Sequence, residues 1–213
     1  MNPKILIADD HVVVRLGLEM LIRNNSQVSI QIEHATSGDI VLSFLQQQEF
    51  DMFIMDMNMP GLNGLALLEK AIKLQPLLKI LVLSVNPQEY FAPKCHQLGA
   101  YGFVSKNSGD EELKKAILSI MGGHPYFPGY IRHTEDNNTP AGNDMLKQLS
   151  TRELDVTMLL LQGKGTLEIA AALTISPSTA STFKGRIFKK LRITSLLELD
   201  GLARRHGLVA HSA

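Results

Sequence analysis

Short apolar runs alternate with stretches of helical periodicity through the first 123 residues. Apolar runs of strand length lie at 4–8, 51–56, 79–84 and 101–106, and residues 28–35 alternate between apolar and polar, which also predicts a strand. After each run, apolar residues recur at helical spacing, which predicts helices at 12–24, 39–48, 65–75, 87–99 and 110–123. Continuous apolar strands that alternate with helices are typical of a parallel sheet covered on both faces. The pattern therefore predicts a doubly wound α/β domain with a five-stranded parallel sheet.

The pattern changes after residue 123. Residues 124–146 end in a polar stretch rich in Asn, Thr, Pro and Gly, which predicts a linker that is mobile around 134–144. Residues 147–213 show only helical periodicity, with helices expected at 151–162, 167–174, 178–191 and 195–206.

Two helix starts in this second part carry clear signals. Ser150 with Glu153 three residues later has the pattern of a capping box, and Ser176 followed by Pro177 marks another start. A short turn separates the second and third helices, which is typical of a helix-turn-helix. The sequence therefore predicts a small all-α domain after the α/β domain.

Charge divides the chain in the same way. Residues 147–213 hold ten Lys and Arg against five Asp and Glu, a net charge of +5, so residues 1–146 carry −5 and the total is zero. A basic helical domain is suited to a polyanionic partner. The single cysteine, Cys95, excludes an internal disulfide and a thiolate-rich zinc site. With no apolar run near the roughly 18 residues of a membrane span, we expect a cytoplasmic protein without a membrane partner.

Polar groups follow four of the five predicted strands. In a doubly wound parallel sheet such groups gather at the carboxyl edge. The groups in question are Asp9 and Asp10 after the first strand, Asp56 after the third, Ser84 after the fourth and Lys106 after the fifth. A single Asp at a strand end is usually only a turn former or helix cap. The joint pattern instead predicts one shared site.

The chemistry of that set suggests a phosphoryl site. Three clustered carboxylates need a cation, and oxygen ligands with room for water suit Mg²⁺. One carboxylate can then act as a nucleophile that forms an acyl phosphate, while Lys106 and Ser84 bind phosphoryl oxygens. We interpret His11 as a surface residue at a helix start and not as a ligand.

Residues 1–123 resemble the receiver domain of response regulators, which has a flavodoxin-like fold. The motifs that carry the likeness are the Asp9–Asp10 pair, MDMNMPGLNG at 55–64, LSV at 83–85 and GAYGFVSK at 99–106. The resemblance implies that Asp56 accepts a phosphoryl group from a sensor histidine kinase or phosphotransfer protein. It implies a Mg²⁺ site made by Asp9, Asp10, Asp56 and the main-chain carbonyl of Asn58. It also implies that Ser84 and Phe103 form a switch pair, although Phe103 is alternatively a permanently buried strand residue.

The third helix of the second domain has two unlike sides. Phe183, Ile187 and Leu191 can face the core, and the opposite side carries hydroxyls and cations suited to phosphates and base edges. Taken alone, this pattern also fits a small bundle with a solvated basic face.

Residues 147–213 resemble the LuxR-type DNA-binding domain of NarL/FixJ-like regulators. The matching positions are 151–153, 163, 168–170, 173–176, 179, 184 and 190–191. The resemblance implies a homodimer whose third helix enters the major groove of double-stranded DNA. It implies base-proximal contacts from Ser181, Thr182 and Gly185, and phosphate contacts from Lys184, Lys189 and Lys190.

These features favour a phosphorylation-controlled DNA-binding transcription regulator, not an enzyme, in which phosphate on Asp56 switches dimerisation and DNA binding. One alternative is a Mg²⁺-dependent aspartyl-phosphate phosphatase, but such enzymes commonly have a second acid where this chain has Asn58. Another is a phosphate-independent DNA-binding or scaffold protein with a vestigial receiver. The bulky Val85 beside the switch hydroxyl and Pro93 inside a helix favour it mildly, whereas the intact polar set opposes it.

Overall fold

A five-stranded parallel sheet forms the centre of the first unit of the chain. Its strands are β1 (Lys4–Ala8), β2 (Gln31–Ala35), β3 (Met52–Asp56), β4 (Lys79–Ser84) and β5 (Gly102–Ser105). The order across the sheet is β2-β1-β3-β4-β5, and every neighbouring pair is parallel. The predicted doubly wound class is confirmed. From β1 the chain adds β2 on one side and then β3, β4 and β5 on the other, so the order of strands reverses between β1 and β3. Ligands bind at this position in such folds.

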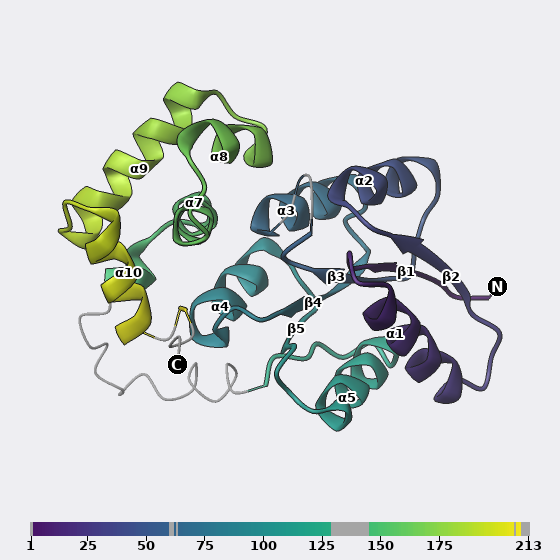
Figure 1. The fold of residues 1–213 in the computed structure, drawn as a ribbon. Coiled ribbons are helices and arrows are strands. Elements are labelled where there is room, and N and C mark those ends of the chain that lie inside the picture. Colours follow the sequence, from purple (N-terminus) through teal and green to yellow (C-terminus); the bar gives the residue numbers. More distant parts are fainter. Residues whose placement is uncertain (1, 60–61, 63, 129–144, 207, 210–213) are drawn as a thin grey trace. The chain divides into compact units, whose positions relative to one another are not determined.

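Five helices cover the two faces of this sheet, as Figure 1 shows. They are α1 (Val12–Asn24), α2 (Gly38–Gln47), α3 (Gly64–Leu74), α4 (Gln88–Leu98) and α5 (Asp110–Met121). Helices α1 and α5 lie on one face, and α2, α3 and α4 lie on the other. Apolar side chains of α1 and α5, such as Ile22 and Ile117, pack with strand residues such as Ile7 in a continuous core.

The computed structural model describes residues 2–59, 62, 64–128, 145–206 and 208–209. The chain divides into two compact units, 1–137 and 138–213. Within the described residues, no helix combines the length and the apolar character that crossing a membrane requires. The stretch predicted to be mobile, 134–144, lies outside the described residues.

One predicted strand starts later than the sequence pattern suggests. β2 begins at Gln31, and not at residue 28. Val28 is 58% exposed, and both its N–H and its carbonyl oxygen bond to the Ser26 hydroxyl, at 3.2 and 3.0 Å. A local turn therefore holds the backbone that the alternating pattern assigned to the strand.

The segment after α5 pairs with the edge of the sheet. Tyr126 forms a parallel bridge with Gly102: its N–H donates to the Tyr101 carbonyl at 3.0 Å, and its carbonyl accepts from the Phe103 N–H at 2.9 Å. The Tyr126 hydroxyl donates to Glu112 Oε1 at 2.8 Å. The edge of β5 is thus closed by residues that the sequence pattern assigned to the linker.

The second unit is helical. It contains a 3₁₀ turn, η1 (Met145–Gln148), followed by α7 (Thr151–Leu161), α8 (Thr166–Leu173), α9 (Pro177–Leu191) and α10 (Leu196–Arg205). The capping box predicted at Ser150 is present, because its hydroxyl accepts from the Glu153 N–H while Glu153 accepts from the Ser150 N–H. Ser176 caps α9 through the Thr179 N–H at 3.1 Å. The four predicted helices are confirmed, and η1 is an addition.

Candidate functional site

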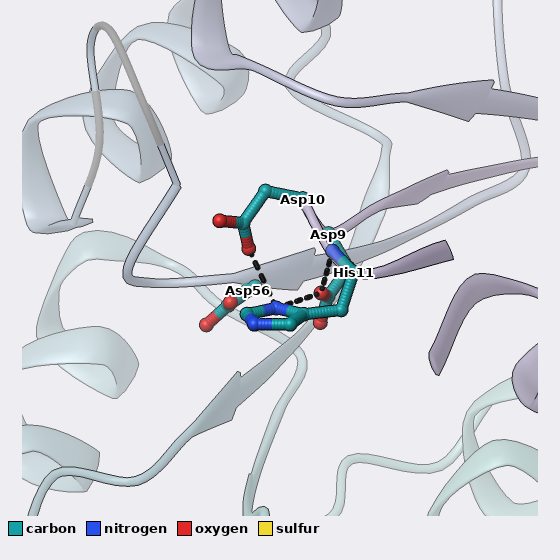
Figure 2. Close-up of side chains that lie close together, drawn as sticks. All are labelled: Asp9, Asp10, His11 and Asp56. Atoms are coloured by element: carbon teal, nitrogen blue, oxygen red, sulfur yellow. Dashed lines mark hydrogen bonds and ion pairs between the residues drawn. The ribbon is translucent and has the colours of Figure 1, made fainter. Parts of the chain in front are cut away.

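Three carboxylates meet at the carboxyl edge of the sheet, between β1 and β3. Asp56 is the last residue of β3, and Asp9 and Asp10 follow β1 directly. Asp9 and Asp56 are only 1% and 2% exposed, whereas Asp10 is exposed. Figure 2 shows these side chains together with that of His11. The sequence-based prediction that the three acids share one edge is confirmed.

Lys106, just beyond β5, joins the two buried carboxylates. Its Nζ donates to Asp9 Oδ2 at 2.6 Å and lies 2.8 Å from Asp56 Oδ2. The other oxygen of Asp9 accepts from the His11 N–H at 2.8 Å, and that of Asp56 accepts from the Asn58 N–H at 3.0 Å. All four buried carboxylate oxygens therefore accept a hydrogen bond from the protein or contact the lysine ammonium.

Burial and pairing pull the ionisation of this pair in opposite directions. Burial raises the pKa of Asp56, and the hydrogen bonds from Lys106 and the Asn58 N–H oppose it only in part. Burial acts to lower the pKa of Lys106, but its bonds to Asp56 and Asp9 prevail and hold that pKa above its ordinary value. Lys106 therefore stays protonated, and the ionised form of Asp56 depends on the positive charge beside it.

The donor set fits a divalent cation. Asp9, Asp10, His11 and Asp56 each offer one ligand atom, and these atoms lie within 4.8 Å of one another. Opposite ligands of an octahedral Mg²⁺ are about 4.2 Å apart, because each Mg–O bond is about 2.1 Å. The ligand atoms would have to approach one another by roughly half an ångström, which a small rotation of a side chain within its rotamer well allows.

His11 is part of this cluster, although its position in the sequence predicts only a surface residue at a helix start. Its position is as expected, since it precedes α1 and its side chain is 69% exposed. Its ring, however, lies between the two neighbouring carboxylates, with Nδ1 at 2.8 Å from Asp10 Oδ1 and 3.2 Å from Asp9 Oδ1 (Figure 2). Its place directly after the Asp9–Asp10 pair was the signal in the sequence.

The remaining residues expected at the site lie on β4 and β5. Ser84 is fully buried at the end of β4, where its Oγ accepts from the Asn86 N–H at 3.0 Å and its carbonyl accepts from the Lys106 N–H at 2.8 Å. Phe103 is fully buried in β5, opposite Val82. Ser84 therefore adjoins Lys106, and Phe103 belongs to the strand that leads to it.

A second candidate site is the polar side of α9. Ser181, Thr182, Gly185 and Lys189 are exposed there, as the sequence predicts. Lys184 is half-buried, and its ammonium lies 5.5 Å from the centre of the Phe188 ring. This side of α9 therefore offers hydroxyls and cations along its length.

Lys190 has a different environment from its neighbour Lys189. Its Nζ donates to Glu153 Oε2 at 2.6 Å and to the Gln148 carbonyl at 3.4 Å. Glu153 is 3% exposed. Burial acts to raise the pKa of Glu153, but the Lys190 and Ser150 hydrogen bonds prevail and hold that pKa below its ordinary value. The Lys190 ammonium thus ties α9 to the start of α7.

A basic cleft lies beside the end of α9. It has a volume of about 660 Å³ and is lined by Met145, Gln148, Arg186, Lys189, Lys190 and Arg192. A smaller hollow of about 280 Å³ along the same helix is lined by Ser178, Thr179, Thr182, Phe183 and Arg186. Arg186 lines both hollows, in agreement with the polar side that the sequence predicts for this helix.

Two family models match the chain, one for each unit. Residues 5–118 match the response regulator receiver domain, and residues 147–203 match the luxR family of bacterial regulatory proteins. The first match covers the sheet and the carboxylate cluster, and the second covers α7 to α9 and most of α10.

Relatives are similar to the chain over its whole length. A putative transcriptional regulator of Pseudomonas aeruginosa is 35% identical over 97% of this chain and 99% of its own. The virulence regulator BvgA of Bordetella pertussis is 33% identical over 98% of this chain and all of its own. Among solved structures, RcsB of Salmonella enterica serovar Typhimurium superposes with a TM-score of 0.78 at 25% identity, covering 96% of this chain and all of that chain.

Fold, acidic site and relatives over the whole length agree with one another. The chain therefore belongs to the NarL/FixJ-type response regulators, in which a receiver domain precedes a LuxR-type helix-turn-helix domain and phosphorylation controls DNA binding and transcription.

Proposed function

We propose that Asp56 is the phosphoryl acceptor of this response regulator. The observation that carries the proposal is the Asp56 carboxylate at the end of β3, contacted by the Lys106 ammonium at 2.8 Å within a cluster of two further acids. A buried carboxylate that is held ionised by neighbouring positive charge is a nucleophile suited to phosphorus.

The proposed transfer uses this chain's own groups at defined atoms. An Asp56 carboxylate oxygen attacks the phosphorus of a phosphohistidine on the donor, the P–N bond breaks, and the freed imidazole takes up a proton. Lys106 exchanges its contact with Asp56 for one with a phosphoryl oxygen, and the Ser84 hydroxyl donates to another. The donor is a sensor histidine kinase or a phosphotransfer protein.

The residues that would hold Mg²⁺ are Asp9, Asp10, Asp56 and the main-chain carbonyl of Asn58. When bound, Mg²⁺ neutralises the phosphoryl oxygens as charge develops on them. The all-oxygen character of these ligands supports the choice of a hard cation.

We further propose that the phosphorylated form pairs with a second copy and binds DNA through α9. The expected contacts to DNA are Ser181, Thr182, Lys184, Gly185, Lys189 and Lys190, with Arg186 added. Solved complexes support this expectation, since RcsB is described as bound to a promoter in the presence of the phosphomimetic BeF3− and as two dimers on two parallel DNAs. We propose a cytoplasmic location, because both proposed partners, DNA and the kinase domain, are accessible there.

Ser84 and Phe103 are the proposed switch pair. Movement of Ser84 toward the phosphoryl group vacates space beside β5, into which the Phe103 ring can shift. The Phe103 N–H also donates to the Tyr126 carbonyl, so the segment that leads to the second unit begins at the proposed switch strand.

The direct test is the intact mass of the protein after incubation with Mg²⁺ and a small phosphodonor. We expect the gain of one phosphoryl group in the natural chain and none in Asp56→Ala. Rapid multiple turnover of the donor without a lasting mass gain would favour the phosphatase alternative. No mass gain, together with DNA binding that the phosphodonor leaves unchanged, would favour the vestigial receiver.

A further inference from the structure

His11 places an imidazole nitrogen among the carboxylates of the proposed cation site. Its Nδ1 lies 2.8 Å from Asp10 Oδ1 and 3.2 Å from Asp9 Oδ1, and both distances are typical of two ligands that share one metal ion or one proton. The ring lies beside the carboxylates, as Figure 2 shows, and 69% of the His11 side chain is exposed to solvent.

The backbone holds this ring in place. His11 immediately precedes α1, and its own N–H donates to Asp9 Oδ1 at 2.8 Å. The Arg15 guanidinium, one turn into α1, donates to the Asp9 carbonyl at 2.7 Å. Two hydrogen bonds thus fix the path of the chain from Asp9 into α1, and with it the direction from which the imidazole approaches the acids.

A nitrogen ligand changes which cations the site prefers. Mg²⁺ takes oxygen ligands almost exclusively, whereas Ni²⁺ and Zn²⁺ accept imidazole readily and gain affinity from it. A site of three carboxylates and a carbonyl binds all of these ions through oxygen alone. An added imidazole strengthens the binding of the transition metals and leaves Mg²⁺ largely unaffected.

We propose that His11 is a ligand of the divalent cation in this receiver and shifts the preference of the site toward transition metals. This inference rests on the proposed cation site of Asp9, Asp10 and Asp56 and specifies its chemistry. The site then takes Mg²⁺ through oxygen and takes Ni²⁺ or Zn²⁺ through oxygen and the His11 nitrogen.

The test is a metal titration of the full chain, without a polyhistidine tag, at a pH at which imidazole is neutral. Loss of the free-ion electron paramagnetic resonance signal gives the affinity for Mn²⁺, and displacement of bound Mn²⁺ gives those for Ni²⁺ and Mg²⁺. The variants are His11→Ala and His11→Asn, of which the second keeps a hydrogen-bonding side chain. His124→Ala is the control for an exposed histidine on the same unit but outside the cluster.

We expect both His11 variants to lose Ni²⁺ affinity by about tenfold or more while Mg²⁺ affinity changes by less than about twofold. His124→Ala should change neither. Equal losses for Ni²⁺ and Mg²⁺, or rescue by His11→Asn, would show that His11 only positions the acids, and no change at all would remove it from the site.

A further variant, Asp10→Asn, separates this inference from the function on which it rests. We expect Asp10→Asn to weaken the binding of both ions. If Asp10→Asn leaves Mg²⁺ affinity unaltered, the shared cation site itself is wrong and the His11 inference falls with it. If Asp10→Asn weakens both ions but the His11 variants weaken neither, only the His11 inference fails.

Discussion

A single ammonium group satisfies two buried carboxylates at the centre of the proposed site. Lys106 contacts Asp9 and Asp56 at 2.6 and 2.8 Å, so two negative charges face one positive charge. The pair of acids is left with an unbalanced charge in a buried place, which is costly unless another cation approaches. This shortage of positive charge favours a divalent cation, and the cation would in turn neutralise the oxygens of a phosphoryl group at Asp56.

The neighbouring lysines 189 and 190 should have separable roles. Lys189 is exposed and forms no ion pair with the described residues, whereas Lys190 binds the buried Glu153. Lys189→Ala should weaken DNA binding, lower the salt slope by about one and change stability by less than about 0.5 kcal/mol. Lys190→Ala should cost roughly 1–3 kcal/mol, because Glu153 loses its partner.

The measurements are DNA binding at several salt concentrations and unfolding of the second unit. Lys189→Ala is the control for the stability measurement on Lys190→Ala, because the two lysines are adjacent on the same helix. Equal stability of the two variants would contradict a structural role for Lys190.

Glu153 should make the stability of the second unit dependent on acid. Its pKa is lowered in the folded state, so the unfolded chain binds the proton more tightly. The stabilisation is complete above the pKa of the unfolded chain, about 4.3, and is lost as the pH falls through the lower folded value. Between about pH 5 and about pH 3, the thermal midpoint should fall more steeply in the natural chain than in Glu153→Gln. Scanning calorimetry measures both, and parallel slopes would contradict the assignment.

At the scale of elements, the periodicity of the sequence was enough to predict every strand and all but one of the helical elements that the described residues contain. The pattern succeeds because β1, β3, β4 and β5 are almost entirely buried, β2 alternates along its length, and each helix has one apolar side. It fails where polar bonds decide the backbone, as at Val28, whose turn is held by the Ser26 hydroxyl. It also fails for the pairing of Tyr126 with Gly102, because one isolated bridge leaves no repeating pattern of apolar residues in the sequence.

Gly102 should be essential for that pairing. A Cβ at this position would lie 2.9 Å from the Tyr126 carbonyl oxygen and 2.8 Å from Ile120 Cδ1, so the edge segment would have to move. Gly102→Ala should therefore destabilise the first unit by about 1–3 kcal/mol and speed hydrogen exchange at the Phe103 N–H. Gly109→Ala is the control, because nothing lies within 4 Å of a Cβ there. A Gly102→Ala protein as stable as this control would contradict the packing.

The candidate sites were predictable to the extent that topology dictates them. Asp9, Asp56 and Lys106 meet because parallel strands deliver their ends to one edge, which the order of motifs already implies. The orientation of the His11 ring and the pairing of Lys190 with Glu153 depend on side-chain geometry across helix ends. Such geometry leaves no pattern along the chain.

At the scale of the whole molecule, the N-terminal and C-terminal parts of the chain carry opposite net charges. Residues 1–146 carry a net charge of −5 and residues 147–213 carry +5. The acidic part is suited to metal and phosphoryl chemistry, and the basic part is suited to a nucleic acid. The two family matches fall on the same two parts.

Mg²⁺ should therefore stabilise one unit and not the other. At a concentration about one hundred times its dissociation constant, Mg²⁺ should add about 2.7 kcal/mol to the first unit, which raises its thermal midpoint by several degrees. The transition of the helical unit should stay in place. Scanning calorimetry of the full chain with and without Mg²⁺ measures both, and Asp10→Asn is the control. A shift of both transitions would mean that the ion acts outside the cluster.

The closure of β5 by Tyr126 also gives the protein an optical reporter. The chain has no tryptophan, and its four tyrosines all precede residue 131. The ultraviolet absorbance of tyrosine therefore reports on the first unit alone. Burial and the bond to Glu112 raise the pKa of Tyr126 to about 12. In an alkaline titration the Tyr126 phenolate should form at a higher pH while Tyr126 is paired with Gly102 than after this pairing is broken. Spectrophotometry without an attached dye can therefore follow the breaking of the pairing.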